Sequence, residues 1–514
     1  MKAFLMYRDR EFDVKQQLPP NEAELTQDLE LNRLYNAMAL GDKDLFEIAR
    51  KVILSSATDL GTILYRQSVL RDCLVNSSVI KSIYSKAVEA IVREKRESWW
   101  LSNKDPGLIV HRSINLLEIF RGLLGELRSI ADEHADEFKS EGLIAFFAML
   151  KRELSDEFLA TLQNYLKQLA FRDGVLISAE LGQGLKGNNY VLRWPQDTKQ
   201  SWVSRVFAQR PRAYTFHLHP RDNSGFESLG ELKDRGLNLV ASTLAQSCDH
   251  VLNFFRALRS ELAFYLGCLN LYEQLRRKGE PTCFPVPIAS DERRHAFKGL
   301  YDVCLTLSME QRVVGNDVRA ENKELVIITG ANQGGKSTFL RSLGVAQLMM
   351  QCGMFVPAES FCANVCDHLF THYKREEDVT MKSGKLDEEL ARMSEIVDHL
   401  TPNSMVLFNE SFAATNEREG SEIARQIISA LLERRIKVFF VTHLYECAHA
   451  FHDRMTENAI FLRAERQPDG GRSFRLVEGE PLQTSYGEDL YERIFNPNRA
   501  PRDRSRTALL SPRA

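Results

Sequence analysis

The sequence has 514 residues, of which 44% are apolar and 27% charged, and its formal net charge is −3. This composition is ordinary for a soluble globular protein, and the length allows about three domains with substantial cores. Because the total charge is close to neutral, any surface for nucleic acid must be a local patch.

Cysteine usage and the lack of long apolar runs indicate a cellular compartment. The nine cysteines are scattered and form no C-x-x-C pair, which favours a reducing cytosol over a disulfide framework. No segment approaches the roughly 18 uncharged apolar residues of a membrane span. Charged residues from Arg8 to Glu11 stand where a secretion signal would need an apolar core. We therefore expect a cytoplasmic protein without a membrane partner.

The first half of the chain is predicted to be mainly helical. Residues 1–25 are charged and contain Pro19 and Pro20, which predicts a short arm. Apolar residues recur at spacings of three and four from Leu143 to Leu169, which predicts one long helix. The stretch from Leu237 to Arg277 lacks proline and predicts a second helix of about 60 Å, at about 1.5 Å per residue. We interpret helices of this length as levers.

Residues 175–235 lack the helical pattern of their neighbours and predict a small β-rich clamp between the levers. Glycines and an alternating run at 214–219 favour strands. The stretch from Thr198 to Arg221 has no acidic residue, and aromatic side chains interleave with its cations. Candidate DNA-binding residues in it are Lys199, Arg205, Arg210 and Arg212. Two interpretations stay open: an ordinary solvated face, or a surface that contacts a phosphate backbone.

The pattern changes again after about residue 320. Three apolar runs, at 325–329, 405–408 and 438–441, alternate with helical stretches, which is typical of a parallel sheet covered by helices. Two further short runs, at 459–462 and 474–477, flank turn residues and predict a hairpin. Residues 496–514 are rich in arginine and proline, and we expect them to be disordered.

A phosphate-binding loop follows the first of these apolar runs. Gly330 to Ser337 reads G-A-N-Q-G-G-K-S, a complete G-x-x-x-x-G-K-S motif between a predicted strand and a predicted helix. Backbone N–H groups of such a loop hold nucleotide phosphates, the lysine reaches the β- and γ-phosphates, and the serine ligates Mg²⁺. The cofactors expected are ATP and Mg²⁺, with Lys336 and Ser337 in these roles.

The second and third apolar runs end in polar residues that suit ATP hydrolysis. Glu410 ends the run at 405–408 and is a candidate to orient or deprotonate the attacking water. Asn409 stands where phosphate-loop ATPases usually place an aspartate on Mg²⁺, so we expect an uncharged metal ligand and slow turnover. His443 ends the third run and is a candidate to sense the γ-phosphate or the water.

Taken together, these motifs resemble those of the MutS family of DNA mismatch-repair ATPases. Residues 329–338 resemble the family's T-G-P-N-M-G-G-K-S-T, with Ala331 and Gln333 as departures. Further matches are N-D-V at 316–318, V-P-A at 356–358, the spacing from Glu410 to Thr415 and Gly420, T-H at 442–443, and a segment at 484–487 that resembles S-Y-G. The motifs cover about 316–487, whereas the match over 26–290 is a matter of helical texture.

The resemblance implies a fold and a set of site residues. The fold is a mainly α core with long lever helices and a small β-rich clamp, followed by an α/β ABC-type phosphate-loop ATPase domain. Such ATPases act as dimers in which a signature serine completes the partner's site, and here the candidate is Ser383, although the family's S-T-F block is not kept after it. The expected ATP-binding residues are Asn316, Gly330, Asn332, Gly334, Gly335, Lys336, Ser337 and Thr338. The predicted order is an arm at 1–25, a core and lever domain at 26–300, an ATPase domain at 301–495 and a tail at 496–514.

The expected function is that of an ATP-switched dimeric clamp on DNA, related to mismatch repair. Family members recognise mismatches with an N-terminal domain that carries a Phe-x-Glu wedge, and we expect this domain to be missing, because the only Phe-x-Glu lies at 408–410. The partners expected are DNA, mismatched or branched, and a second copy or a MutS relative. Three alternatives stay open: an ATP-dependent structural or regulatory dimer acting on protein or ribosome, a module with negligible hydrolysis, or a relative acting on branched recombination intermediates.

Overall fold

The computed structural model describes residues 1–98, 105–171, 174–185, 187–193, 215, 217–375, 384–454, 457–467, 471–482 and 495. Contacts divide the chain into two compact units. Unit 1 comprises Met1–Phe4, Ser78–Lys139 and Leu143–Leu262, and unit 2 comprises Leu5–Ser77, Ser140–Gly142 and Ala263–Ala514. The predicted domain boundary near residue 300 therefore lies inside unit 2.

Unit 1 is almost entirely helical. Its elements are α5 (Ser77–Ser98), α6 (Pro106–His134), η1 (Ala135–Glu137), α7 (Glu141–Glu153), α8 (Asp156–Leu169), β1 (Leu176–Leu181), η2 (Gln183–Leu185), β2 (Gly187–Arg193) and the first part of α10 (Asn223–Arg277). Phe120 of α6 packs on Phe255 of α10, with ring centroids 5.6 Å apart, and both side chains are buried. Such contacts between apolar stripes, more than helix propensity, hold helices of this kind together.

The apolar stripe from Leu143 to Leu169 belongs to two helices, so the prediction of one long helix was wrong. The chain leaves the helix at Leu154, and the Ser155 side chain accepts a hydrogen bond from Phe158 N–H, 3.2 Å away, to start α8. Serine followed by Asp156 and Glu157 is a strong helix start, because the cap satisfies an orphan N–H and the acids suit the helix dipole. Apolar residues keep their spacing of three and four across this break, so the sequence pattern does not reveal where one helix ends and the next begins.

The second predicted long helix is confirmed, and it begins earlier than expected. α10 runs for 55 residues, about 80 Å at 1.5 Å per residue, and the boundary between the two units falls within it. Its start at Asn223 makes part of the predicted clamp helical. The strands β1 and β2 form an antiparallel pair, whereas the described residues of the alternating run at 214–219 are not in a strand.

Unit 2 begins with residues that were predicted to form an arm. Leu5, Met6 and Phe12 are buried in its core, so the first apolar side chains of the chain are structural. Four helices follow: α1 (Glu22–Asp28), α2 (Leu31–Ala39), α3 (Lys43–Leu54) and α4 (Leu60–Val75). After α10 come β3 (Val286–Ile288), η3 (Ser290–Glu292), β4 (His295–Leu300), α11 (Val303–Ser308) and β5 (Asn316–Ala320).

The remaining elements of unit 2 build the sheet that the apolar runs predict. They are β6 (Leu325–Gly330), α12 (Lys336–Gln351), β7 (Ser360–Asn364), β8 (Leu369–Tyr373), α13 (Lys385–His399), β9 (Met405–Asn409), α14 (Glu417–Glu433), β10 (Lys437–Val441), α15 (Tyr445–Arg454), β11 (Ala459–Arg466) and β12 (Arg472–Glu478). A six-stranded sheet has the order β12-β11-β6-β10-β9-β8, parallel except for the β11–β12 hairpin. A second sheet has the order β3-β7-β4-β5. The parallel sheet and the hairpin are confirmed.

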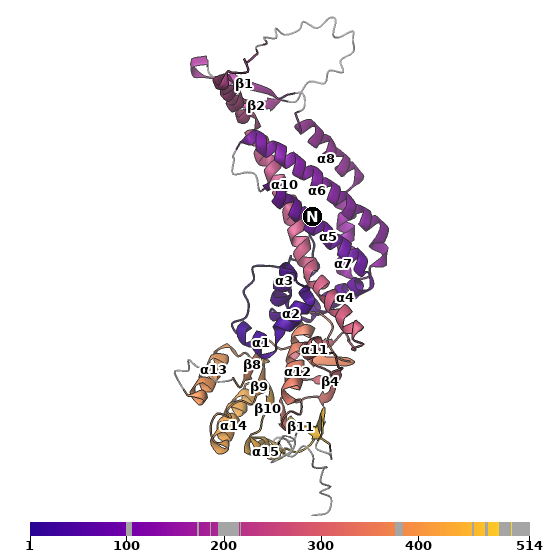
Figure 1. Ribbon diagram of the computed structural model, residues 1–514, viewed down its shortest axis with the longest axis vertical. Helices are drawn as coiled ribbons and strands as arrows, with labels where there is room; N and C mark the ends of the chain where they lie inside the picture. Colours follow the sequence, from indigo (N-terminus) through magenta and orange to yellow (C-terminus); the bar gives the residue numbers. More distant parts are fainter. Residues whose placement is uncertain are drawn as a thin grey trace, which may run out of the picture. The chain divides into compact units, whose positions relative to one another are not determined.

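Helices cover both faces of the six-stranded sheet (Figure 1). Side chains at alternate strand positions point to opposite faces. One face packs against α13, α14 and α15 through Leu325, Ile327, Val406, Phe408, Val438 and Phe440. The other face packs against α12, where Gly344 lies so close to Leu407 that a Cβ on it would be 2.7 Å from Leu407 Cδ1. The helix after the phosphate-loop motif is thus seated on the sheet. No helix in the described part of the chain has the length and apolar character of a membrane span.

Candidate active site

Three parallel strands bring the predicted site residues to one edge of the sheet. Val441 of β10 pairs with Ile328 of β6 on one side and with Asn409 of β9 on the other. The strands therefore end side by side, and the segments that follow them, which contain Lys336, Glu410 and His443, leave the same edge. The carboxyl edge of a parallel sheet is where ligands bind in such folds.

The loop from Gly330 to Ser337 needs its glycines. Gly330 and Gly335 have φ values of 107° and 86°, which favour glycine. A Cβ on Gly334 would lie 2.7 Å from Ala464 Cβ and 2.9 Å from the Ala331 carbonyl oxygen. Gly335 is the N-cap of α12, so the first N–H groups of this helix face the loop. The geometry suits a phosphate group, which backbone N–H groups at a helix start can bind.

Lys336 lies inside this loop. Its side chain is buried, and Nζ donates hydrogen bonds to the carbonyl oxygens of Gly330 and Ala331, at 3.1 and 2.9 Å. Burial lowers the pKa of Lys336 to about 8, and the nearby Glu410 carboxylate opposes this shift. Two backbone carbonyl oxygens therefore hold the Lys336 amine inside the loop.

Ser337 and Asn409 form a pair of oxygen donors beside the loop. Ser337 Oγ, at the start of α12, donates a hydrogen bond to Asn409 Oδ1, at the end of β9, over 2.9 Å. Hydroxyl and amide oxygens are ligands that Mg²⁺ accepts, and Mg²⁺ keeps several waters in addition. The donor set therefore fits Mg²⁺, with no negative charge supplied by either side chain.

Glu410 and His443 also meet at this edge. His443 Nε2 lies 3.1 Å from Glu410 Oε1, and about a third of each side chain is exposed. The hydrogen bond from His443 lowers the pKa of Glu410, although burial acts in the opposite direction, and Lys336 adds to the lowering. Glu410 is therefore an ionised carboxylate, and His443 Nε2 must carry the proton that it donates.

Other predicted site residues are placed differently. The Asn316 side chain is occupied by β12: Nδ2 donates to Phe474 O over 3.3 Å, and Oδ1 accepts from Leu476 N–H over 2.7 Å. Asn332 is exposed, and its carbonyl oxygen accepts a hydrogen bond from Arg472 Nε. Thr338 is half-buried beside Ser337. Ser383, Lys199, Arg205, Arg210 and Arg212, and the segment at 484–487, lie outside the described residues.

A cavity of about 670 Å³ opens on the Ser337 and Asn409 side of the site. The sequence patterns did not indicate its three cationic residues, Arg341, Lys374 and Arg375. Lys374 directly follows β8, and its backbone N–H bonds to Asn409 O over 2.9 Å. β8 itself was missed, because Thr371 and His372 interrupt the apolar run by which the other strands were found. The sequence L-F-T-H-Y of Leu369–Tyr373 has neither an unbroken apolar run nor strict alternation, so no local pattern marks it as a strand.

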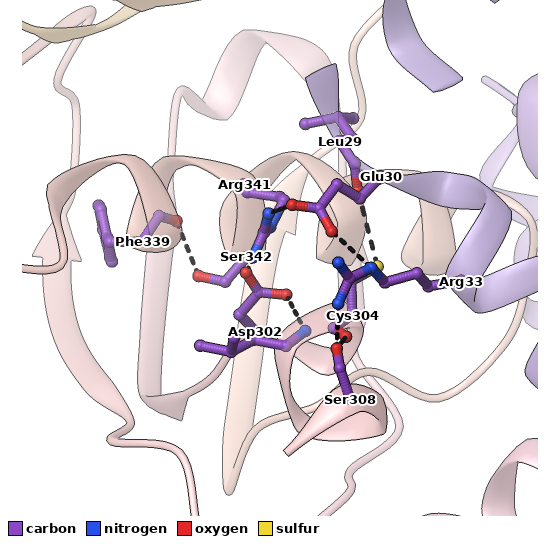
Figure 2. Close-up of polar contacts among 10 residues, drawn as sticks. Leu29, Glu30, Arg33, Asp302, Cys304, Ser308, Phe339, Arg341 and Ser342 are labelled. Atoms are coloured by element: carbon purple, nitrogen blue, oxygen red, sulfur yellow. Dashed lines mark hydrogen bonds and ion pairs between the residues drawn. The ribbon is translucent and has the colours of Figure 1, made fainter. Parts of the chain in front are cut away.

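Arg341, one turn beyond the loop on α12, ties this helix to the N-terminal helices of unit 2 (Figure 2). Its Nε lies 2.5 Å from the buried Asp302 Oδ2, and its Nη1 bonds to Glu30 Oε1. Glu30, between α1 and α2, also pairs with Arg33, 2.7 Å away. Asp302 caps α11 by accepting Leu305 N–H over 3.0 Å. One guanidinium therefore connects three segments that are distant in sequence.

Two family models match the chain. MutS2 N-terminal domain matches residues 58–278, and MutS domain V matches residues 326–507. The second match contains Lys336, Asn409, Glu410 and His443, so it includes the residues that meet at the sheet edge.

Proteins with similar sequences are named as MutS proteins. The DNA mismatch repair protein MutS of Thermotoga sp. (strain RQ2) is 32% identical over 215 residues, which cover 41% of this chain and 27% of the relative. MutS of Streptococcus thermophilus (strain LMD-9) is 26% identical over 262 residues, covering 50% and 30%. MutS protein homolog 4 of Mus musculus is 30% identical over 168 residues, covering 33% and 17%. The chain thus spans less than a third of the length of each of these relatives. With a MutS-type match in each half and the expected motifs gathered at one sheet edge, the chain is a MutS-family protein.

Proposed function

We propose that this chain is a MutS-type ATPase that binds ATP and Mg²⁺ at residues 330–337 and acts as a dimer on DNA. The observation that carries the proposal is the meeting of two side-chain pairs beside the loop: Ser337 with Asn409 at 2.9 Å, and His443 with Glu410 at 3.1 Å. Each pair joins residues from separate elements, so the geometry is a property of the fold. The MutS domain V match over 326–507 supports the same assignment.

The roles of the residues follow from their chemistry. Lys336 offers a cation and the start of α12 offers N–H groups to the phosphates. Ser337 and Asn409 would hold Mg²⁺, which neutralises charge on the phosphate oxygens when bound. Glu410 accepts a proton from the attacking water at a carboxylate oxygen, and His443 orients that carboxylate through Nε2–H. Because Asn409 brings no charge, we expect weaker Mg²⁺ binding and slow turnover.

The DNA and dimer parts of the proposal rest on other evidence. The relatives are named as DNA mismatch repair proteins, and the acid-free stretch at 198–221 supplies cations for a phosphate backbone. Ser383 is the residue we propose to complete the site of a partner subunit. Long helices such as α10 suit a lever that transmits a nucleotide-dependent movement, which is how an ATP-switched clamp would work.

Lys336→Ala tests the nucleotide site. Removing the ammonium group should abolish measurable ATP binding in an equilibrium titration, because the loop loses the cation directed at the β- and γ-phosphates. Lys298→Ala is the matched control: this lysine lies on β4 and pairs with Glu359 over 2.8 Å. Tight ATP binding by Lys336→Ala would refute the phosphate-loop assignment.

A further inference from the structure

The turn that follows Glu410 is held in an unfavourable backbone conformation. The backbone φ angle is 54° at Glu410 and 64° at Phe412, and residues other than glycine adopt such values rarely. Glu410 N–H bonds to Val441 O over 2.8 Å, which anchors the start of the turn to β10. A strained backbone conformation persists only where contacts with the surrounding structure hold it in place. Strained residues of this kind are frequent at functional sites. The contacts that impose this turn therefore bear on where the Glu410 carboxylate points.

His372 of β8 provides one set of these contacts. Its Nε2 lies 2.9 Å from the Glu389 carbonyl oxygen, which can only accept, so Nε2 carries a proton. Its Nδ1 lies 2.7 Å from Ser411 Oγ, and the same hydroxyl lies 2.6 Å from the His372 carbonyl oxygen. The imidazole ring stacks on the Phe412 ring, with centroids 5.2 Å apart and an angle of 19°. Ser411 and Phe412, the two residues after Glu410, are thus both fixed by one buried histidine.

Glu389 of α13 provides the second set. Its Oε2 accepts a hydrogen bond from Phe412 N–H over 2.8 Å, and its carbonyl oxygen accepts from His372. The Glu389 side chain is buried, so its loss would leave Phe412 N–H without this acceptor in the interior. α14 closes the third side, because a Cβ on Gly420 would collide with the Phe412 carbonyl oxygen.

We propose that His372 and Glu389 are positioning residues for Glu410, which hold the 410–412 turn so that the carboxylate faces His443 and the loop. Neither residue touches the nucleotide-binding loop in this arrangement. Both act through Ser411 and Phe412. The inference rests on the proposed function.

The test uses the chain of 514 residues with three substitutions at His372 and Glu389 and one control substitution. His372→Phe keeps a ring to stack on Phe412 and removes both nitrogen contacts. Glu389→Ala removes the acceptor of Phe412 N–H, whereas Glu389→Gln keeps an oxygen there and should rescue. Glu395→Ala is the control, because Glu395 lies exposed on the same helix. For each variant, kcat and KM for ATP hydrolysis, ATP affinity, and hydrogen exchange of residues 408–416 in nucleotide-free protein are measured.

We expect kcat to fall by about 10- to 100-fold in His372→Phe and Glu389→Ala, as misplacement of a catalytic group produces, with ATP affinity unchanged. Exchange of the 408–416 amides should quicken in both variants, and Glu389→Gln and Glu395→Ala should behave as wild type. Wild-type kcat in both His372→Phe and Glu389→Ala would overturn the inference alone. A parallel loss of kcat, ATP affinity and thermal stability would also overturn it, as a purely structural effect. No hydrolysis by the wild-type chain would overturn the proposed function together with this inference.

Discussion

Asn409 places a neutral amide oxygen 2.9 Å from the Ser337 hydroxyl, at a position where phosphate-loop ATPases usually carry an aspartate. Mg²⁺ is a hard cation that favours charged oxygen ligands, so the amide lowers the electrostatic part of its binding. The remaining geometry of the pair is intact. The presence of asparagine at position 409 therefore predicts a site with suitable oxygen ligands for Mg²⁺ but with weak affinity for it.

Asn409→Asp should lower the Mg²⁺ concentration needed for half-maximal ATP hydrolysis. We expect a change of about tenfold, equivalent to about 1.4 kcal/mol, because a carboxylate replaces an amide among the ligands. The measurement is a Mg²⁺ titration of the hydrolysis rate at saturating ATP. Asn322→Asp, in the exposed turn before β6, serves as the control. An unchanged Mg²⁺ requirement would show that Asn409 is not a ligand.

At the scale of elements, the contacts of Arg341 decide how α12 is fixed to its neighbours (Figure 2). Its guanidinium is largely buried between the carboxylates of Asp302 and Glu30, and Asp302 is fully buried. Removing one partner from a buried pair leaves an uncompensated charge, which is far more costly than breaking a surface pair. We expect Arg341 to matter for stability more than any exposed arginine of unit 2.

Arg341→Ala should reduce the free energy of unfolding of unit 2 by about 3–5 kcal/mol, the cost of leaving the buried Asp302 carboxyl group without its partner. Arg33→Ala is the comparison, because Arg33 pairs with the same Glu30 but is about half exposed. That variant should lose less than about 1 kcal/mol. Denaturant unfolding followed by fluorescence compares the two. Equal losses in both variants would contradict the role given to Arg341.

Most strands of the six-stranded sheet were predictable because their sequence signals are local. Apolar runs predicted β6, β9, β10 and the β11–β12 hairpin, and the glycine loop after β6 predicted its own position. The break between α7 and α8 was missed, because a helix cap at Ser155 does not disturb the spacing of apolar residues. β8 was missed because His372 has partners, Ser411 and Glu389, that only the fold brings near. The residues of the loop at 330–337 were thus predictable from the sequence. Residues such as His372, whose partners come from other elements of the fold, were not.

For the whole molecule, we expect the cations at 198–221 to contact a phosphate backbone. Charge reversal of Arg205, Arg210 and Arg212 should weaken duplex DNA binding and reduce the salt dependence. If each contacts a phosphate, the slope of log K against log salt should fall by about 0.9 per residue. Reversal of three exposed arginines elsewhere, Arg152, Arg276 and Arg434, changes the net charge equally and should leave this slope unaltered. Equal losses in both triple variants would assign binding to net charge alone.

We propose that Glu410 is the general base and that the loop binds ATP through Lys336. Single-turnover hydrolysis of labelled ATP, measured together with ATP affinity, compares wild type with Glu410→Gln. We expect Glu410→Gln to bind ATP as wild type does and to hydrolyse it at least about 100-fold more slowly, the usual contribution of a general base. Hydrolysis at the wild-type rate in Glu410→Gln would rule out Glu410 as the base.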